Sequence, residues 1–237
     1  MRVEGGTFSM GSSKMEPGRA NQHPLHEVTV PTFAMMKREV INSEYKACVA
    51  AGKCPEWPEV CSKAPHPDPL PAPCLDFDRA EAVCHFLGGR LPTESEWEYV
   101  ATTGGRPHPY PWGPEPHDCT RANVSQTKDT PNAPRIPSCR KAGLWPPCSH
   151  PAGSTPAGFC DMGGNVFEWT ADWFQPTYED HPRDGSVQTQ KHPDWGDNRV
   201  MRGGGIGSKV DPDVRVRTFH EGHFQYAGMG ARCAKDL

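Results

Sequence analysis

The ten cysteines of this 237-residue chain constrain its fold more than any other feature. No two of them form the C-x-x-C pair that is typical of zinc ribbons and thioredoxin-like sites. An even number of cysteines without such pairs favours disulfides, which persist in oxidising compartments. We therefore predict an extracytoplasmic protein, whether secreted, periplasmic or anchored to an envelope. The alternative is a cytosolic protein whose free cysteines are buried in the core. The cysteines lie at positions 48, 54, 61, 74, 84, 119, 139, 148, 160 and 233.

The composition indicates a small core with long loops. Gly 24 and Pro 27 together exceed a fifth of the residues, while the seven Trp argue against a disordered chain. The net charge of -4 provides no broad basic surface for nucleic acid. No apolar run reaches the roughly 20 residues that a membrane helix needs. The first residues do not resemble a signal peptide, so we interpret the sequence as a mature or excised domain.

Three short helices are predicted, over residues 42–52, 76–89 and 93–105. Asn42 and Asp76 or Asp78 are plausible N-caps, and Thr93 with Glu96 three residues later forms a capping box. The third helix carries Glu94, Glu96 and Glu98, which resemble paired acid/base carboxylates. We favour a simpler interpretation, in which they stabilise the positive end of the helix and are otherwise solvated.

Strands are predicted within residues 26–40, 166–174, 199–204 and 214–219, where apolar and β-branched residues gather. Residues 104–160 are dense in Pro, Gly, Asn and Cys and show no periodicity, so this stretch needs disulfides or a metal ion to hold it in a compact domain. These patterns predict one α+β domain over residues 1–237.

Seven segments occur in an order that identifies a family. They are "GGTFSMGS", "EVINSEY", "RLPTESEWEYVATTGG", "YPWG", "DMGGNVFEWTADW", "RVMRGG" and "GMGARCA". The set spans essentially the whole chain and resembles the formylglycine-generating-enzyme (sulfatase-modifying-factor) family. The resemblance implies a C-type-lectin-like α+β fold with little regular secondary structure and disulfide-stapled loops. It also implies a disulfide between Cys84 and Cys233.

The resemblance implies calcium as a cofactor. The family's "GNVWEW" segment is matched here by Asn165 and Glu168, with the backbone carbonyls of Gly163 and Val166 as further oxygen ligands. A hard cation prefers such clustered oxygen donors. A second family site is matched by Asn123 and Val124, but its later ligands cannot be placed because "SQTKDTPNAPRIPSC" departs from the family pattern. Without the resemblance, Asn165 would be interpreted as a turn residue after two glycines.

The family's copper site has no counterpart in this sequence. In the generating enzymes two cysteine thiolates that follow the "RGG" turn bind one copper ion. A gap-free alignment on residues 202–204 and 215–217 places these cysteines on Ser208 and Asp213, and a family serine on Gly205. A hydroxyl and a carboxylate are hard ligands that cannot replace two thiolates at a soft Cu(I) ion.

We therefore predict a non-catalytic, calcium-stabilised binding or accessory module whose ligand is a protein, a peptide or a glycan. The ligand would lie in the cleft that holds copper in the enzymes. Trp169, Trp173 and Trp195 are candidates for the cleft surface, although core packing is favoured for Trp169 and for Trp97. The polar groups expected in the cleft come from Arg202, Gly205, Ser208, Asp213, Arg215 and Arg217.

The alternative is a divergent metal-dependent oxidase, either formylglycine-generating or of the non-haem-iron type, that acts on a peptide or thiol substrate. His220, Glu221 and His223 form the two-histidine, one-carboxylate set that suits such iron. Adjacent residues of an extended segment point to opposite sides, which disfavours this set because His220 and Glu221 are neighbours.

Overall fold

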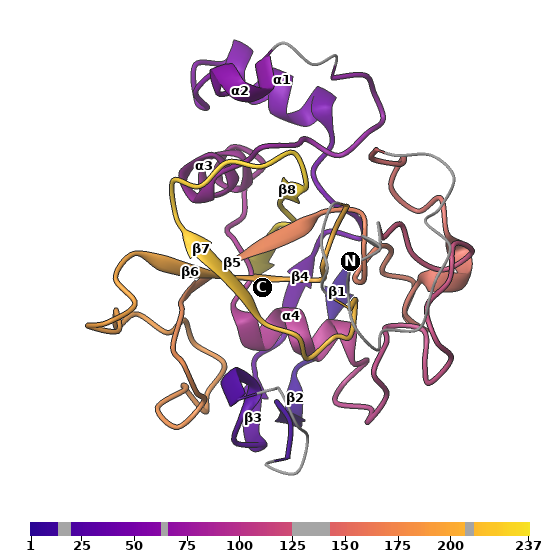
Figure 1. The fold of residues 1–237 in the computed structure, drawn as a ribbon, viewed down its shortest axis with the longest axis vertical. Helices are drawn as coiled ribbons and strands as arrows, with labels where there is room; N and C mark the ends of the chain where they lie inside the picture. Colours follow the sequence, from indigo (N-terminus) through magenta and orange to yellow (C-terminus); the bar gives the residue numbers. More distant parts are fainter. Residues whose placement is uncertain (14–19, 63–65, 125–142, 207–210) are drawn as a thin grey trace, which may run out of the picture.

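Short strands and short helices are joined by long irregular segments, as predicted. The structure is a computed structural model that describes residues 1–13, 20–62, 66–124, 143–206 and 211–237. Strand β5 (Phe167–Trp173) lies in the middle of a four-stranded sheet with the order β7-β6-β5-β8. Strands β6 (Asn198–Arg202) and β7 (Thr218–Glu221) continue it antiparallel, and β8 (Met229–Gly230) pairs parallel to β5. Figure 1 shows β5 with β6 and β7 on one side and β8 on the other.

Two smaller sheets involve the first residues of the chain. Strands β2 (Gly6–Met10) and β3 (His26–Val30) pair antiparallel, and their alternate residues Phe8, Met10, Val28 and Val30 are buried. The other sheet has the order β1-β4-β9, with β1 at Arg2–Val3, β4 at Phe33–Met35 and β9 at Ala234–Asp236. Strand β4 therefore brings the first and last residues of this sequence into one sheet.

The three predicted helices are confirmed as α1 (Asn42–Ala50), α3 (Phe77–Phe86) and α4 (Glu94–Ala101). Asp76 caps α3, and Thr93 with Glu96 forms the expected capping box of α4. Shorter pieces are α2 (Glu59–Ser62) and the 3-10 helices η1 (Ala20–Gln22) and η2 (Pro151–Gly153). Helix α4 contacts β2, β3, β5 and β6, which places it in the interior beside the four-stranded sheet.

Two expectations about element ends are wrong. Asn42 is the first residue of α1 rather than its cap, because the Glu44 carboxylate accepts the Ile41 N–H at 2.9 Å and closes the first turn from inside the helix. The strand expected over residues 214–219 begins only at Thr218. The preceding residues form a turn, in which the Val216 N–H donates to the Asp213 carbonyl.

Four disulfides join described cysteines, and Cys84–Cys233 is among them, which confirms the implied pair. Cys119 is disulfide-bonded as well, and no cysteine among the described residues is free. This oxidised state is compatible with an extracellular location. No helix within the described ranges is both long and apolar enough to cross a membrane. The other three pairs are Cys48–Cys54, Cys61–Cys74 and Cys148–Cys160.

Candidate functional site

The segment after β6 packs its glycines tightly against the sheet. Gly203 and Gly204 have φ angles of 88° and 71°, a region that favours glycine. A Cβ on Gly205 would lie 2.9 Å from the backbone nitrogen of Phe167, so a serine side chain at this position would need the start of β5 to move. Ser208 lies outside the described residues.

Arg202, expected to contact a ligand, is instead fully buried. Its Nη1 donates to Glu94 Oε1 at 2.6 Å, and its Nη2 donates to Glu98 Oε2 and to the Val214 carbonyl, each at 2.5 Å. The guanidinium therefore joins helix α4 to the chain beyond the glycine turn. Arg202 ties interior elements together and is not a cleft residue.

Arg217, also expected in the cleft, is buried with a bidentate contact to Glu94. Its Nε and Nη2 donate to the two Glu94 oxygens at 2.7 and 2.9 Å, and its Nη1 donates to the Asn21 and Gln175 carbonyls. Burial alone would raise the pKa of Glu94, but the charges of Arg217 and Arg202 outweigh it and lower this pKa to about 2.

The expectation that Glu94, Glu96 and Glu98 are solvated is wrong, because all three are at most 1% exposed. Each of the three carboxylates has an arginine partner. Helix α4 can therefore lie in the interior, because ion pairing offsets the cost of burying its charges. Glu96 pairs with Arg90 at 2.7 Å and also accepts the Thr93 N–H. Burial nevertheless raises the pKa of Glu98, despite its contact with Arg202.

The other predicted cleft residues, Asp213 and Arg215, form the turn that precedes β7. Asp213 Oδ1 accepts the Arg215 N–H at 3.0 Å, and the Asp213 N–H donates to Asp211 Oδ1 at 3.1 Å. Asp213 is 2% exposed, whereas the Arg215 side chain is 22% exposed. The Asp211 side chain is 45% exposed, so Asp211 and Arg215 are the charged residues of this turn that reach solvent.

One imidazole that the sequence did not indicate lies beside this turn. His117 Nδ1 is 3.9 Å from Asp211 Oδ1, and the Tyr110 ring packs against the imidazole in a T-shaped contact with the centroids 5.6 Å apart. Burial lowers the pKa of His117 and raises the pKa of Asp211. No spacing rule links residues so distant in the sequence, so only the folded chain reveals this pair.

A pocket of about 150 Å³ is lined in part by Tyr110, whose ring also packs against His117. Tyr110 stacks on Trp112 in this wall, with the ring centroids 5.1 Å apart. A 2.8 Å hydrogen bond from the Val214 N–H to the Pro109 carbonyl joins this wall to the turn that precedes β7. The pocket is lined by residues 101–103, Arg106, His108, residues 110–115 and Pro156.

The asparagines of the two expected calcium sites lie in contact. Asn165 has a φ of 63°, and its Oδ1 accepts from Asn123 Nδ2 at 3.2 Å. Asn165 Nδ2 donates to Glu39 Oε1 at 3.0 Å, while Glu39 Oε2 is buried without a hydrogen-bond partner among the described residues. Burial, together with the charges of Asp161 and Glu168, raises the pKa of Glu39 well above its usual value. Glu39 is a carboxylate at this position that the sequence did not indicate. Val124 is buried.

Glu168, expected as a calcium ligand, is already bound by other side chains. Its oxygens accept from Arg232 Nη2 at 2.8 Å and from the Trp97 indole N–H at 2.7 Å. Among the described residues, no three His, Cys, Asp or Glu side chains lie together in a metal-binding group. Gly163 and Val166, whose backbone carbonyls were the further expected ligands, are both buried.

The alternative iron ligands lie at the exposed edge of the four-stranded sheet. His220 stacks on Phe224 with the centroids 3.9 Å apart, and His223 Nε2 is 3.2 Å from Glu221 Oε2. His220 and Glu221 are neighbours in β7 and so point to opposite faces. The described part of the chain does not gather these three side chains into a metal-binding group.

The tryptophans divide between core and surface. Trp169 and Trp97 are completely buried, and the Trp169 indole donates to the Leu75 carbonyl at 2.7 Å. Trp173 lies under the Arg199 guanidinium at 3.3 Å, and Trp195 is 37% exposed. Trp195 is therefore the most accessible of the three tryptophans expected at a surface.

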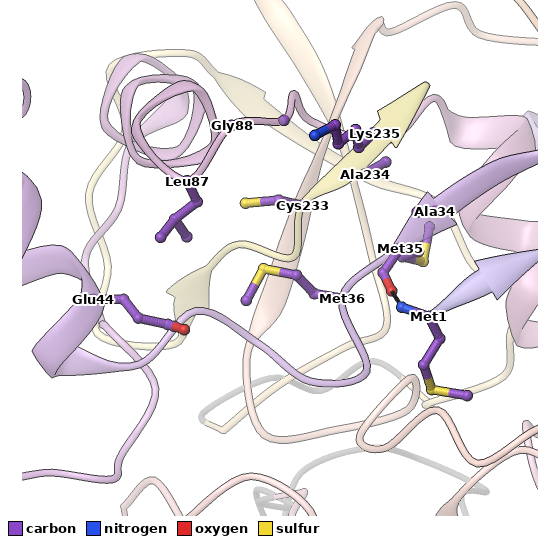
Figure 2. Close-up of a pocket in the computed structure, with 11 residues that line it drawn as sticks. Met1, Ala34, Met35, Met36, Glu44, Leu87, Gly88, Cys233, Ala234 and Lys235 are labelled. Carbon is purple, nitrogen blue, oxygen red and sulfur yellow. Dashed lines mark hydrogen bonds between the residues drawn. The ribbon is translucent and has the colours of Figure 1, made fainter. Parts of the chain in front are cut away.

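A second pocket, of about 340 Å³, lies between the end of α3 and the β1-β4-β9 sheet. Figure 2 shows Met36, Leu87 and Cys233 around it, and the Met1 amine donating to the Met35 carbonyl at 2.5 Å. None of the expected cleft or metal-binding residues lines this pocket.

The sequence and the structure both resemble known proteins. The family model of the sulfatase-modifying factor enzyme 1-like domain matches residues 1–237. The inactive C-alpha-formylglycine-generating enzyme 2 of Mus musculus is 30% identical over 227 residues, which cover 76% of this chain and 70% of that protein. The serine/threonine-protein kinase Pkn1 of Chlamydia trachomatis serovar L2 is 29% identical over 255 residues. That match covers 99% of this chain, which spans 38% of the kinase's length. PvdO from Pseudomonas aeruginosa has a similar structure, with a TM-score of 0.78 and 25% identity over 100% of this chain and 94% of that one.

Proposed function

This chain belongs to the sulfatase-modifying factor enzyme 1-like family, and on that premise we propose that it is a non-catalytic, calcium-stabilised, extracytoplasmic binding module. The observation that carries this proposal is the lack of any cysteine at the positions where the family's copper ligands align. The sequence has no cysteine from residue 161 to 232, and every cysteine that the structure describes is disulfide-bonded. Copper(I) held by two thiolates beside the glycine turn therefore has no ligands from these residues.

The pocket that Tyr110 and Trp112 line is the proposed ligand-binding site. Its wall is hydrogen-bonded to the turn that precedes β7 through Val214 and Pro109. Its stacked rings and charged Arg106 and Glu115 side chains suit a polar ligand with flat faces. A peptide or a glycan, alone or on the surface of a protein, has these properties. Because Arg202 and Arg217 are buried, we propose that the ligand contacts this wall and the solvent-accessible Asp211 and Arg215 side chains instead of those two arginines.

The domain should not convert the cysteine of a sulfatase-type peptide to formylglycine. The sequence has no cysteine where the resemblance aligns the two copper ligands, so we expect incubation with copper and oxygen to give neither thiol loss nor aldehyde by mass spectrometry. A formylglycine-generating enzyme run in parallel is the positive control. Turnover by the unmodified domain would reject the non-catalytic proposal and favour a divergent metal-dependent oxidase.

Calcium should raise the melting temperature of the domain, and a chelator should lower it. An ion that binds only the folded state adds about 2.7 kcal/mol at a concentration of 100 times its Kd. Glu39 Oε2, which is buried beside Asn165 and has no hydrogen-bond partner among the described residues, supports this site. Glu39→Gln and Asn165→Ala should lose most of the calcium response, and Glu221→Gln, on the exposed β7 edge, should keep it. A wild-type protein indifferent to calcium would remove this part of the proposal.

A further inference from the structure

His117 holds a buried nitrogen for which the described residues provide no hydrogen-bond partner. Its Nδ1 makes no hydrogen bond within the described part of the chain, and His117 as a whole is only 7% exposed. Asp211 Oδ1 lies 3.9 Å away, which is beyond hydrogen-bonding distance. A buried polar atom without a partner is unusual in a folded protein and points to a species that fills the gap.

Neighbouring groups fix the positions of both side chains. Tyr110 packs edge-on against the imidazole, and the Asp213 N–H donates to Asp211 Oδ1 at 3.1 Å. The Val214–Pro109 backbone bond holds the two chain segments together. Such contacts orient ligand atoms before an ion arrives, as outer hydrogen bonds do in protein metal sites.

The chemistry of the two groups suits a borderline transition-metal ion. Zinc binds imidazole nitrogen and carboxylate oxygen at about 2.0–2.2 Å in tetrahedral geometry, so one ion can bridge the two atoms once the partly exposed Asp211 side chain moves slightly closer than its present 3.9 Å. Calcium, by contrast, prefers oxygen ligands. The partly exposed Asp211 side chain gives an ion a route from solvent.

We propose that His117 Nδ1 and the Asp211 carboxylate form a binding site for a divalent ion of the zinc class, beside Tyr110, which also lines the pocket of about 150 Å³. No third His, Cys, Asp or Glu within the described ranges completes a three-residue group. The ion would therefore keep open positions for water or for a donor atom of a bound ligand. This site is separate from the β7 histidines and from the calcium region, and it does not depend on whether the domain is catalytic.

Zinc titration of the tag-free, chelator-treated full chain by calorimetry tests the proposal, with calcium present in excess. Wild type should bind one equivalent with micromolar affinity. His117→Ala and Asp211→Asn should each weaken binding at least tenfold. His220→Ala and His223→Ala are the matched controls, and both should bind zinc like wild type.

Cobalt gives a readout that a structural defect would not mimic. Co²⁺ should produce visible absorption bands in wild type. Asp211→Asn, which keeps the shape of the side chain, should lose these bands, and its melting temperature without metal should stay close to that of wild type. Failure of wild type to bind zinc at micromolar concentration, or zinc binding that survives both substitutions, overturns the site. If the domain binds zinc and the sulfatase-type peptide keeps its thiol, the zinc site and the non-catalytic role are both supported. If the peptide loses its thiol and this loss requires His117, the zinc site stands and the non-catalytic role is rejected.

Discussion

Replacing Cys84 and Cys233 together by alanine should lower the free energy of unfolding by about 5 kcal/mol in the chain-entropy model, because this disulfide spans 149 residues. The crosslink limits the freedom of the unfolded chain over more than half of its length. Domains are typically stable by about 5–15 kcal/mol, so this loss removes a large share of the total. Urea denaturation followed by fluorescence of the seven tryptophans would measure it.

The Cys48–Cys54 disulfide is the matched control. It spans six residues, so the same model gives about 2 kcal/mol when both cysteines are replaced by alanine. Both disulfides belong to the same core cluster, which keeps the loss of buried sulfur similar. Equal destabilisation by the two double substitutions would contradict the loop-length explanation. Peptide mapping without reductant should confirm that the remaining disulfides are intact.

Arg202→Met should destabilise the fold by about 3–5 kcal/mol, the usual result of removing one partner of a buried ion pair. Methionine fills much of the volume of the arginine side chain. However, Glu98 then loses its ion-pair partner, and Glu94 keeps Arg217 as its one remaining arginine partner. The result would be measured as a change in the midpoint and free energy of urea unfolding.

A second substitution distinguishes lost charge pairing from lost packing. Adding Glu98→Gln to Arg202→Met should recover part of the stability, since the uncompensated carboxylate is then removed. Arg2→Met breaks an exposed ion pair with Glu4 and should leave the unfolding midpoint unchanged. If Arg202→Met changed the unfolding midpoint as little as Arg2→Met, the buried ion pairs of Arg202 would not stabilise the fold.

Local signals predicted the helices well because a cap acts within three or four residues. Asp76 and Thr93 accept backbone N–H groups of their own helices, so the chemistry that starts each helix is visible in a short window. The turn at residues 213–216 was missed because Val214 to Phe219 alternate like a strand. There, the carboxylates of Asp211 and Asp213 bind nearby backbone N–H groups and hold a turn instead.

The site was predicted less well because its groups are distant in sequence. An arginine after a strand usually reaches solvent, and nothing near Arg202 indicates that Glu94 and Glu98 will pair with it. Glu39 and His117 occur in segments without a motif, so neither was identified. The family resemblance did place Asn165 and Asn123, which the fold brings into contact.

Residues 232–236 provide interaction partners for residues much earlier in the sequence. Arg232 pairs with the buried Glu168, Cys233 closes on Cys84, and β9 pairs with β4. During synthesis, Glu168 and Cys84 therefore lack these partners until residues 232–236 have been translated. The domain cannot fold progressively from its first residue, and its interior is completed only after translation of this region.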